Sequence, residues 1–394
     1  MISLSIGLNL STLPWTALFL NTAMPAPLIG ESPQQLQLET REIKTWEPPA
    51  DPDKPVCPYR TDFTVDIKSH TPPAPFGGRD YGRGTRTTVP REILQSTRQS
   101  ELVVRHPPLM TADPPTQRTA KFLITDEVAV ADGRGAQLAI CTITPKIAGQ
   151  AAFKAVAKIF DPLYYSFSNK DVLSVPCDVT WDADMDYSRE AAAYEHLERI
   201  GETGSLAPKY FGSWTFNMVI HVGDTMHQRP VRLLLIENVP GPSIRQLCLS
   251  HHAETFDKAY RLEILAIILD GYAKLLFKGI AQNDLAARNV ICSYPPNTQP
   301  AELQHTPPRI VLIDYNAAIV YEKTRYGIRP WQKDTLPPNP MDLYWNDTLM
   351  AFDGWIPAEW EATPSLRQEW LSSRFGGQNA ARYARLRNKL EITK

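Results

Sequence analysis

The sequence has few cysteines, and no pattern among them would join distant parts of the chain. There are five in 394 residues, an odd number, and no two of them form a Cys-x-x-Cys pair. Histidines do not stand at the spacing of a zinc site either. These absences argue against both a disulfide framework and a zinc site. We therefore expect a reducing compartment, cytoplasmic or nuclear.

The sequence also lacks an excess of charge and a long hydrophobic run. Its 41 basic and 43 acidic side chains leave a formal net charge of −2, so the chain as a whole has no pull toward nucleic acid or anionic lipid. The most apolar stretch, residues 260–276, is interrupted by charged side chains. The first 30 residues are uncharged, but they lack a basic region and contain Pro14, which argues against a secretory signal. We thus expect neither nucleic acid nor a membrane as a partner.

Proline is abundant but unevenly placed. Of the 35 prolines, 17 precede residue 117, whereas none lies between Ser243 and Tyr294. Average chains carry roughly 5% proline, so this one is enriched. The N-terminal stretch has no sustained helical or alternating periodicity, which predicts that residues 1–117 are mostly disordered. A second proline-rich stretch, residues 295–308, reads as an insertion between two strands.

After residue 120 the pattern becomes that of a folded domain. Alternating or continuous apolar runs predict strands at residues 122–143 (two strands joined by an Asp-Gly-Arg-Gly turn), 152–161, 229–239, 290–294 and 309–316. Apolar side chains at helical spacing predict helices over residues 188–200, 254–278 and 378–390. Asp186 or Ser188 is the expected N-terminal cap of the first of these helices.

Three of these segments carry residues suited to one kind of chemistry. Lys158 lies on a strand in AVAKIF, Asp284 and Asn289 lie in NDLAARN after the long helix, and Asp314 ends an apolar strand in LIDYN. Phosphoryl transfer needs held phosphates, metal ions fixed by carboxylate and amide oxygens, and an oriented hydroxyl. All of these residue types are present, in chain order, so the sequence favours a site that holds nucleotide phosphates and metal ions.

At these residues the sequence resembles the protein-kinase-like superfamily. AVAKIF is similar to the V-A-I-K strand motif, NDLAARN matches H-R-D-L-x-x-x-N from its aspartate to its asparagine, and LIDYN stands where D-F-G is expected. The resemblance implies an α+β, two-lobed protein-kinase-like fold, with a small antiparallel-sheet N-lobe, one helix, and a mainly helical C-lobe. It implies an N-lobe through the hinge over residues 118–242 and a shortened C-lobe with a C-terminal helix over residues 243–394.

The same resemblance implies a role for each residue of the site. Lys158, paired with Glu190, would hold the ATP phosphates. Asn289 and Asp314 would hold Mg²⁺, and Asp284 would orient the acceptor hydroxyl. The acceptor stays open: it is either a protein serine, threonine or tyrosine or a small alcohol.

Further residues are implied for binding of the nucleotide. Gly133 and Gly135 resemble a loop that covers phosphates, although an ordinary hairpin turn explains them equally well. The backbone of Glu237 and Val239 would meet adenine in a hinge-like segment. Glu195 lies on the same predicted helix as Glu190 and is the alternative partner of Lys158.

Departures from the motifs support a second hypothesis. Gln282 and Asn283 replace the His-Arg pair that precedes the catalytic aspartate, and Asn316 replaces the glycine of D-F-G. These changes are compatible with a pseudokinase, a nucleotide-binding or scaffolding module that acts on a partner protein without turnover. The retained lysine, aspartates and asparagine favour catalysis instead.

Overall fold

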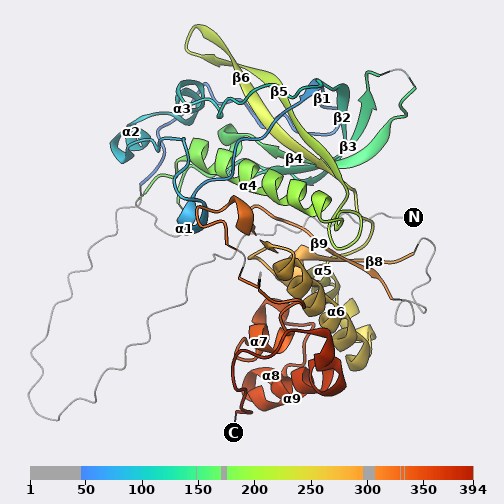
Figure 1. Ribbon diagram of the computed structural model, residues 1–394. Helices are drawn as coiled ribbons and strands as arrows, with labels where there is room; N and C mark the ends of the chain where they lie inside the picture. Colours follow the sequence, from blue (N-terminus) through green and yellow to red (C-terminus); the bar gives the residue numbers. More distant parts are fainter. Residues whose placement is uncertain are drawn as a thin grey trace, which may run out of the picture.

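The computed structural model describes residues 46–147, 149–169, 175–295, 307–328, 330–331 and 333–393. The apolar first 30 residues and most of the insertion expected at residues 295–308 lie outside these ranges. The described chain is α+β: a barrel of antiparallel strands forms one end, and a mostly helical part forms the other (Figure 1).

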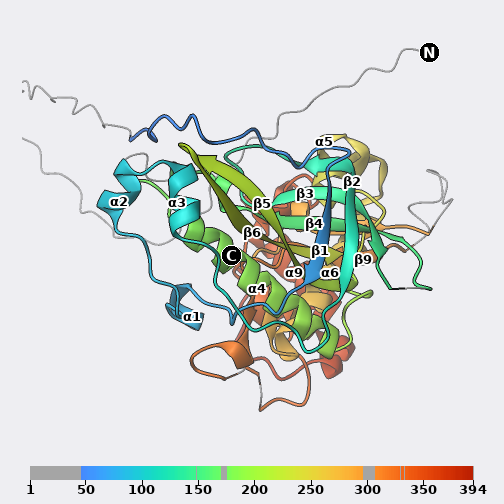
Figure 2. The ribbon, with the colours of Figure 1, turned by 90° about the horizontal axis from the view of Figure 1, so that it is seen from above.

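Six strands form the closed barrel, in the order β1-β2-β3-β4-β6-β5. They are β1 (Thr64–Ser69), β2 (Thr119–Ala129), β3 (Gln137–Pro145), β4 (Phe153–Phe160), β5 (Tyr210–Val222) and β6 (Thr225–Ile236). The closing strand is β1, which pairs antiparallel with β2 on one side and with β5 on the other. Figure 2 shows β1 beside β2. Closure leaves no free edge among these six strands.

The closed barrel overturns the predicted fold. The resemblance to the protein-kinase-like superfamily implied a small N-lobe sheet, and a closed six-stranded barrel is not typical of such a lobe. The prediction was wrong because it counted only strands after residue 118, which without β1 would form an open sheet. β1 lies in the proline-rich stretch, and its six residues give too short an alternation to detect. The two-lobed kinase-like fold is therefore not that of this chain; the division at residue 243 stays a prediction.

Side-chain alternation along the strands fills the barrel. On β4, Ala155, Ala157 and Ile159 are fully buried in the barrel interior, where they pack with residues such as Phe122 and Leu233. The intervening residues of β4 point to the other face of the sheet, since successive side chains of a strand alternate. Small and large apolar residues together fill the narrow interior.

The segment before the barrel hairpins is folded over residues 46–117. It contains α1 (Gly78–Tyr81), α2 (Arg91–Ser96) and α3 (Gln99–Arg105) in addition to β1. Several of its large apolar side chains are buried: Tyr59, Phe76 and Leu102 are at most 1% exposed. The predicted disorder of residues 1–117 therefore does not hold for residues 46–117, because anchoring side chains compensate for the weak local periodicity; residues 1–45 lie outside the described ranges.

The longest helix, α4 (Val179–Arg199), lies against the barrel (Figure 1). Its N-terminal cap is Asp178, whose side chain accepts a hydrogen bond from the Trp181 N–H, so the helix begins well before the predicted caps at Asp186 and Ser188. The helical prediction missed two turns because Thr180, Trp181 and several aspartates interrupt the apolar stripe.

The mostly helical part follows the barrel. Its helices are α5 (Ile244–Leu249), α6 (Lys258–Phe277), α7 (Pro340–Tyr344), α8 (Glu359–Ala362) and α9 (Pro364–Phe375). Two short antiparallel sheets accompany them: β7 (Ile280–Ala281) with β10 (Ile319–Val320), and β8 (Val290–Ser293) with β9 (Arg309–Leu312). Short 3₁₀ helices occur at η1 (Pro162–Tyr164), η2 (His252–Thr255), η3 (Ala287–Asn289), η5 (Tyr321–Lys323), η6 (Met350–Phe352) and η7 (Gly377–Arg382).

The secondary-structure predictions after residue 120 have mixed outcomes. The hairpin at residues 122–143, the strand at 152–161 and the long helix at 254–278 are confirmed by β2, β3, β4 and α6. The helix predicted over residues 378–390 is wrong. The last α-helix, α9, ends at Phe375, and only the 3₁₀ helix η7 follows it. Gly376 and Gly377 end the α-helix because glycine loses the most conformational freedom in a helix.

Candidate active site

Lys158 reaches out of the barrel sheet toward α4. Its strand neighbours Ala157 and Ile159 fill the barrel interior, whereas Phe160, two residues on, packs on the α4 side. Alternation therefore places Lys158 on that side as well. The Lys158 side chain is 10% exposed, and its Nζ lies 2.5 Å from Glu190 Oε2 and 2.7 Å from Asp314 Oδ1.

Glu190 and Asp314 approach this lysine from different elements. Glu190 lies on α4 and is 1% exposed, whereas Asp314 follows β9 and keeps 37% of its side chain exposed. The Tyr315 N–H also points to Glu190, with its nitrogen 3.4 Å from Oε1. Glu195, the alternative partner, lies 2.9 Å from Lys323 instead. The structure thus brings Lys158, Glu190 and Asp314 together.

The pKa values of Lys158, Glu190 and Asp314 shift differently, because one ammonium pairs with two carboxylates. Burial alone would lower the pKa of Lys158, but Asp314 and Glu190 outweigh it and hold this pKa above its ordinary range. Burial raises the pKa of Glu190 to about 7 against the opposing charge of Lys158. Burial would likewise raise the pKa of Asp314, yet Lys158 keeps it below the ordinary value. At neutral pH the lysine and Asp314 are charged, while Glu190 is near its midpoint.

Asp314 is held in an uncommon backbone conformation. Its φ is 64°, in the left-handed region that non-glycine residues rarely adopt. Gln282, fully buried, donates its side-chain amide to the Ile313 carbonyl at 2.5 Å, and the Ile313 N–H donates to the Asn289 carbonyl at 2.9 Å. These bonds fix the end of β9, and such local strain is often found at functional sites.

Asp284 is surrounded by donors from its own loop. Arg288 Nη2 lies 2.5 Å from Asp284 Oδ1 and 2.7 Å from Oδ2. Asn289 Nδ2 donates to Asp284 Oδ2 at 2.7 Å and to the Asp284 carbonyl at 2.9 Å. Because its amide nitrogen is used in this way, Asn289 has its Oδ1 as the remaining side-chain acceptor. Burial raises the pKa of Asp284 although Arg288 opposes this.

The loop between β2 and β3 carries the two predicted glycines. Gly133 has φ 70°, and a side chain at Gly135 would approach the Tyr165 ring, 4.0 Å away. The buried side chain of Gln137 stabilises the loop, because its Nε2 donates to the carbonyls of Ala131 and Gly135. The Arg134 charge on this loop helps to lower the pKa of Asp314, so the loop lies near the lysine cluster.

The predicted adenine-contacting segment follows β6. The Glu237 N–H donates to the Lys209 carbonyl at 2.9 Å, and the Glu237 carboxylate pairs with Arg309. Within the described ranges, neither the Glu237 carbonyl nor the Val239 N–H has a hydrogen-bond partner. The segment therefore offers one acceptor and one donor, the pair that the edge of an adenine base requires.

Three residues near the cluster were missed by the sequence analysis. Asp186 lies one turn before Glu190 on α4, and burial raises its pKa to about 7. Burial also raises the pKa of Asp182, one turn earlier, to about 6. The i, i+4, i+8 spacing of these carboxylates was a readable signal of one helix face. The third, Arg288, was readable only as a neighbour of Asn289.

Mg²⁺ fits these residues only with help from a ligand. Among the described residues no group of three or more His, Cys, Asp or Glu is arranged to hold a metal ion. Mg²⁺, however, is commonly held by one or two carboxylates together with substrate phosphates and waters. Asp314, with its second carboxylate oxygen, and Asn289 Oδ1 meet that lower requirement. The site is thus suited to a metal that arrives with a phosphate group.

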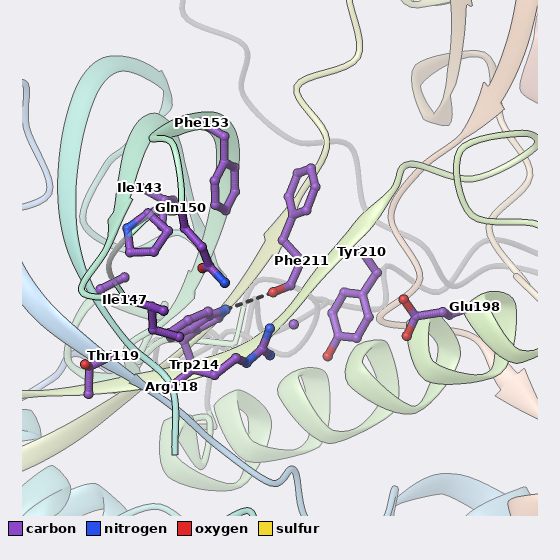
Figure 3. Close-up of a pocket in the computed structure, with 13 residues that line it drawn as sticks. Arg118, Thr119, Ile143, Ile147, Gln150, Phe153, Glu198, Tyr210, Phe211 and Trp214 are labelled. Atoms are coloured by element: carbon purple, nitrogen blue, oxygen red, sulfur yellow. Dashed lines mark hydrogen bonds between the residues drawn. The ribbon is translucent and has the colours of Figure 1, made fainter. Parts of the chain in front are cut away.

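A separate pocket of about 370 Å³ lies at the barrel end near the C-terminus of α4. Trp214, Phe211, Tyr210 and Phe153 line it, together with Arg118 and Glu198, and it contains none of the predicted site residues. Figure 3 shows the Arg118 side chain beside the Trp214 ring, and its guanidinium carbon lies 5.1 Å from the ring centroid. The candidate site is therefore distinct from this pocket.

The helices and the comparisons with known proteins add the following findings. None of the described helices has both the length and the apolar character needed to cross a membrane. No known protein-family model matches this chain, and no curated protein does so either.

Proposed function

We propose that this chain binds ATP with Mg²⁺ and transfers the γ-phosphate to a hydroxyl, on a protein serine, threonine or tyrosine or on a small alcohol. One observation carries the proposal: a buried lysine is held between carboxylates from two separate elements, and the strand end that carries one of them, Asp314, is hydrogen-bonded to the loop of Asp284 and Asn289. The proposal rests on the site alone, since function follows from site geometry rather than from fold.

Lys158 is the expected phosphate ligand. Its ammonium stays charged and is presented from a rigid strand, so phosphate oxygens can replace Asp314 as its partner. Glu190 keeps the ammonium in place during that exchange, because its own bond to Lys158 comes from the buried side. Positioning and charge stabilisation are the main contributions that a protein makes to phosphoryl transfer.

Asp314 and Asn289 would hold the metal. Once phosphate draws Lys158 away, both carboxylate oxygens of Asp314 are available, and Asn289 presents its Oδ1. Bound Mg²⁺ would neutralise the charge on the phosphate oxygens. The carbonyl of Glu237 and the N–H of Val239 would bind adenine, and the loop at Gly133 and Gly135 would lie over the phosphates.

Asp284 would orient the acceptor hydroxyl and take its proton. For this to happen, one carboxylate oxygen must be released from Arg288. Burial raises the pKa of Asp284, which brings this base closer to neutral pH and makes it a better proton acceptor.

A second candidate function is a nucleotide-binding or scaffolding module without turnover. It is favoured by the same Asp284, both of whose carboxylate oxygens are engaged by Arg288. If that pairing persists when ligands bind, no acceptor hydroxyl can reach the base. The two candidates share nucleotide binding and differ only in the freedom of Asp284.

Calorimetric titration of the full chain with Mg-ATP tests the shared part. Wild type is expected to bind in a Mg²⁺-dependent manner, and Lys158→Ala and Asp314→Asn are expected to lose that binding. Lys154→Ala is the matched control, because Lys154 lies on the same strand with an exposed side chain. Absence of Mg²⁺-dependent binding by wild type refutes both candidates.

Turnover separates the two candidates. ATP consumption is measured against a panel of peptides and small alcohols, with Asp284→Asn as the comparison. A loss of about 100-fold or more in kcat with unchanged Mg-ATP affinity supports phosphotransfer. Binding without turnover supports the module, and turnover that Asp284→Asn leaves intact contradicts the role of this residue.

A further inference from the structure

Residues 76–86, here called the clamp, join α4 to the segment that follows Asp314. At one side Arg189, the residue before Glu190, donates its Nε–H to the Phe76 carbonyl at 2.8 Å. The same guanidinium lies over the Tyr81 ring, 5.7 Å from its centroid. The clamp thus contacts α4 at the helical turn that carries Glu190.

At its other side the clamp holds the segment after Asp314 through one hydroxyl. Tyr81, 9% exposed, donates its O–H to the Ala318 carbonyl at 3.1 Å and accepts the Val320 N–H at 2.6 Å. Burial raises the pKa of Tyr81 to about 12, so the hydroxyl keeps the proton that it donates. The Arg325 N–H adds a bond to the Asp80 carbonyl at 3.0 Å.

Two glycines allow the clamp to lie close to α4. A Cβ on Gly77 (φ 87°) would lie 2.5 Å from Met185 Sδ and 2.9 Å from Arg189 Nη2, and one on Gly78 (φ 69°) would lie 3.0 Å from Arg189 Nη2. A side chain at Gly77 would therefore displace the Met185 and Arg189 side chains from their present positions and would strain the backbone at its positive φ. Glycine at these two positions thus allows the close contact between the clamp and α4.

A buried ion pair at the end of the clamp fixes it to α4 again. Arg86 pairs with Asp184, and both side chains are at most 7% exposed. Arg86 also donates to the carbonyls of His106 and Pro107, so that it ties α4 to a later part of the N-terminal segment. The clamp is thus attached to α4 at both ends and to the Asp314 segment in its middle.

We propose that the clamp is a positioning element that keeps Glu190 and Asp314 together at Lys158, with Tyr81 as its central positioning residue. This inference rests on the proposed function, because it assigns to the clamp the assembly of that site. Two carboxylates that face one ammonium repel each other, so an added link between their elements opposes separation. Among the described residues, the hydroxyl of Tyr81 bonds Ala318 and Val320 and not the three charged residues of the site.

Hydrogen exchange on the free, full-length chain tests the clamp without relying on activity. Tyr81→Phe removes the acceptor of the Val320 N–H, and exchange at this amide should rise about tenfold. The Tyr315 amide, which points to Glu190, should also exchange faster if the clamp holds the two elements together. Arg189→Gln, which breaks the other side of the clamp, should accelerate Tyr315 as well.

Tyr59→Phe is the matched control. It removes another buried tyrosine hydroxyl, one that bonds Asp161 in the barrel, and should accelerate neither amide beyond the small rise that its loss of global stability causes at all slowly exchanging amides. Faster exchange at Val320 alone, with Tyr315 unchanged in both variants, overturns the proposal, because Tyr81 would then make only a local bond. Equal acceleration by Tyr59→Phe overturns it too, since the effect would be one of general stability.

A second readout links the clamp to the site. With Mg-ATP, Tyr81→Phe should require about tenfold more Mg²⁺ for half-maximal binding, whereas Tyr59→Phe should match wild type. An unchanged Mg²⁺ requirement in Tyr81→Phe overturns the inference. Wild type that binds no Mg-ATP refutes the proposed function instead, and the exchange at Tyr315 then decides the clamp by itself.

Discussion

The ammonium of Lys158 lies 2.7 Å from Oδ1 of Asp314, although 156 positions separate the two residues in the sequence. Glu190, on a third element, completes the contact from the buried side at 2.5 Å. Three elements therefore meet at the charge of Lys158: the barrel strand β4, the helix α4 beside it, and the end of the short strand β9. The predictions below follow from this convergence and from the closure of the barrel.

Replacing Lys158 with methionine should destabilise the chain more at pH 8 than at pH 6. Without the ammonium, Glu190 and Asp314 face each other unpaired, and a buried charge without a partner costs about 3 kcal/mol, less here because Asp314 is partly exposed. Lys158 lowers the pKa of Glu190, which is about 7 in wild type, so this carboxyl binds its proton more tightly in the variant. At pH 6 the bound proton relieves the repulsion, whereas at pH 8 either the charge or the uptake of the proton costs free energy. Urea unfolding at both pH values, with Lys154→Met as control, measures the difference; an equal loss at the two pH values would contradict this account.

Replacing Asp186 with asparagine should stabilise the protein at pH 8 by at least about 1 kcal/mol and should have a clearly smaller effect at pH 5. The native pKa of Asp186 is about 7, against an ordinary value of 3.8. The folded chain therefore binds more protons than the unfolded chain between these values. Stability from this group is complete below pH 3.8 and is lost as the pH rises through 7. Asparagine cannot ionise, and its side-chain oxygen can still accept from the Tyr165 hydroxyl.

The measurement is the denaturation midpoint at pH 5, 6, 7 and 8. Asp224→Asn provides the comparison, because Asp224 is exposed in the turn after β5 and water solvates its carboxylate. Parallel pH profiles for wild type and Asp186→Asn would show that this carboxylate is not held in its protonated form.

Replacing Asp161 with asparagine should cost about 3–5 kcal/mol. Its carboxylate is fully buried and pairs with Arg229 at 2.5 and 2.9 Å, so the variant leaves a buried guanidinium without a counter-charge. Tyr59→Phe, which removes only the hydroxyl that donates to Asp161, should cost about 1 kcal/mol. Chemical denaturation ranks the two variants, and similar losses would mean that the ion pair contributes little.

A chain that begins at residue 119 should be less stable than one that begins at residue 46, and it should associate. Removing residues 46–118 deletes β1, which exposes the edges of β2 and β5 and opens the barrel interior that Ile67 fills. Size-exclusion chromatography and thermal unfolding compare the two chains. A monomeric shorter chain with the same melting temperature would show that β1 contributes nothing to the barrel.

Local patterns were a good guide to single elements. Apolar alternation located β2, β3 and β4, and the helical stripe located α6, because both depend on residues a few positions apart. The same patterns did not predict β1, whose partners in β2 and β5 lie more than 50 positions away in the sequence. They also missed the start of α4, where aspartates take the place of apolar residues. The kinase-like fold was wrong for this reason.

By itself, the sequence determined which residue types are available: a strand lysine, a loop aspartate and asparagine, and an aspartate after an apolar strand. Only the tertiary structure decided how they are paired. It placed Glu190 rather than Glu195 at Lys158, engaged Asp284 with Arg288, and tied α4 to the Asp314 segment through Tyr81. Residue type and spacing set the local conformation, whereas the partner of a charge depends on which distant elements the closed barrel and its clamp bring within a few ångströms.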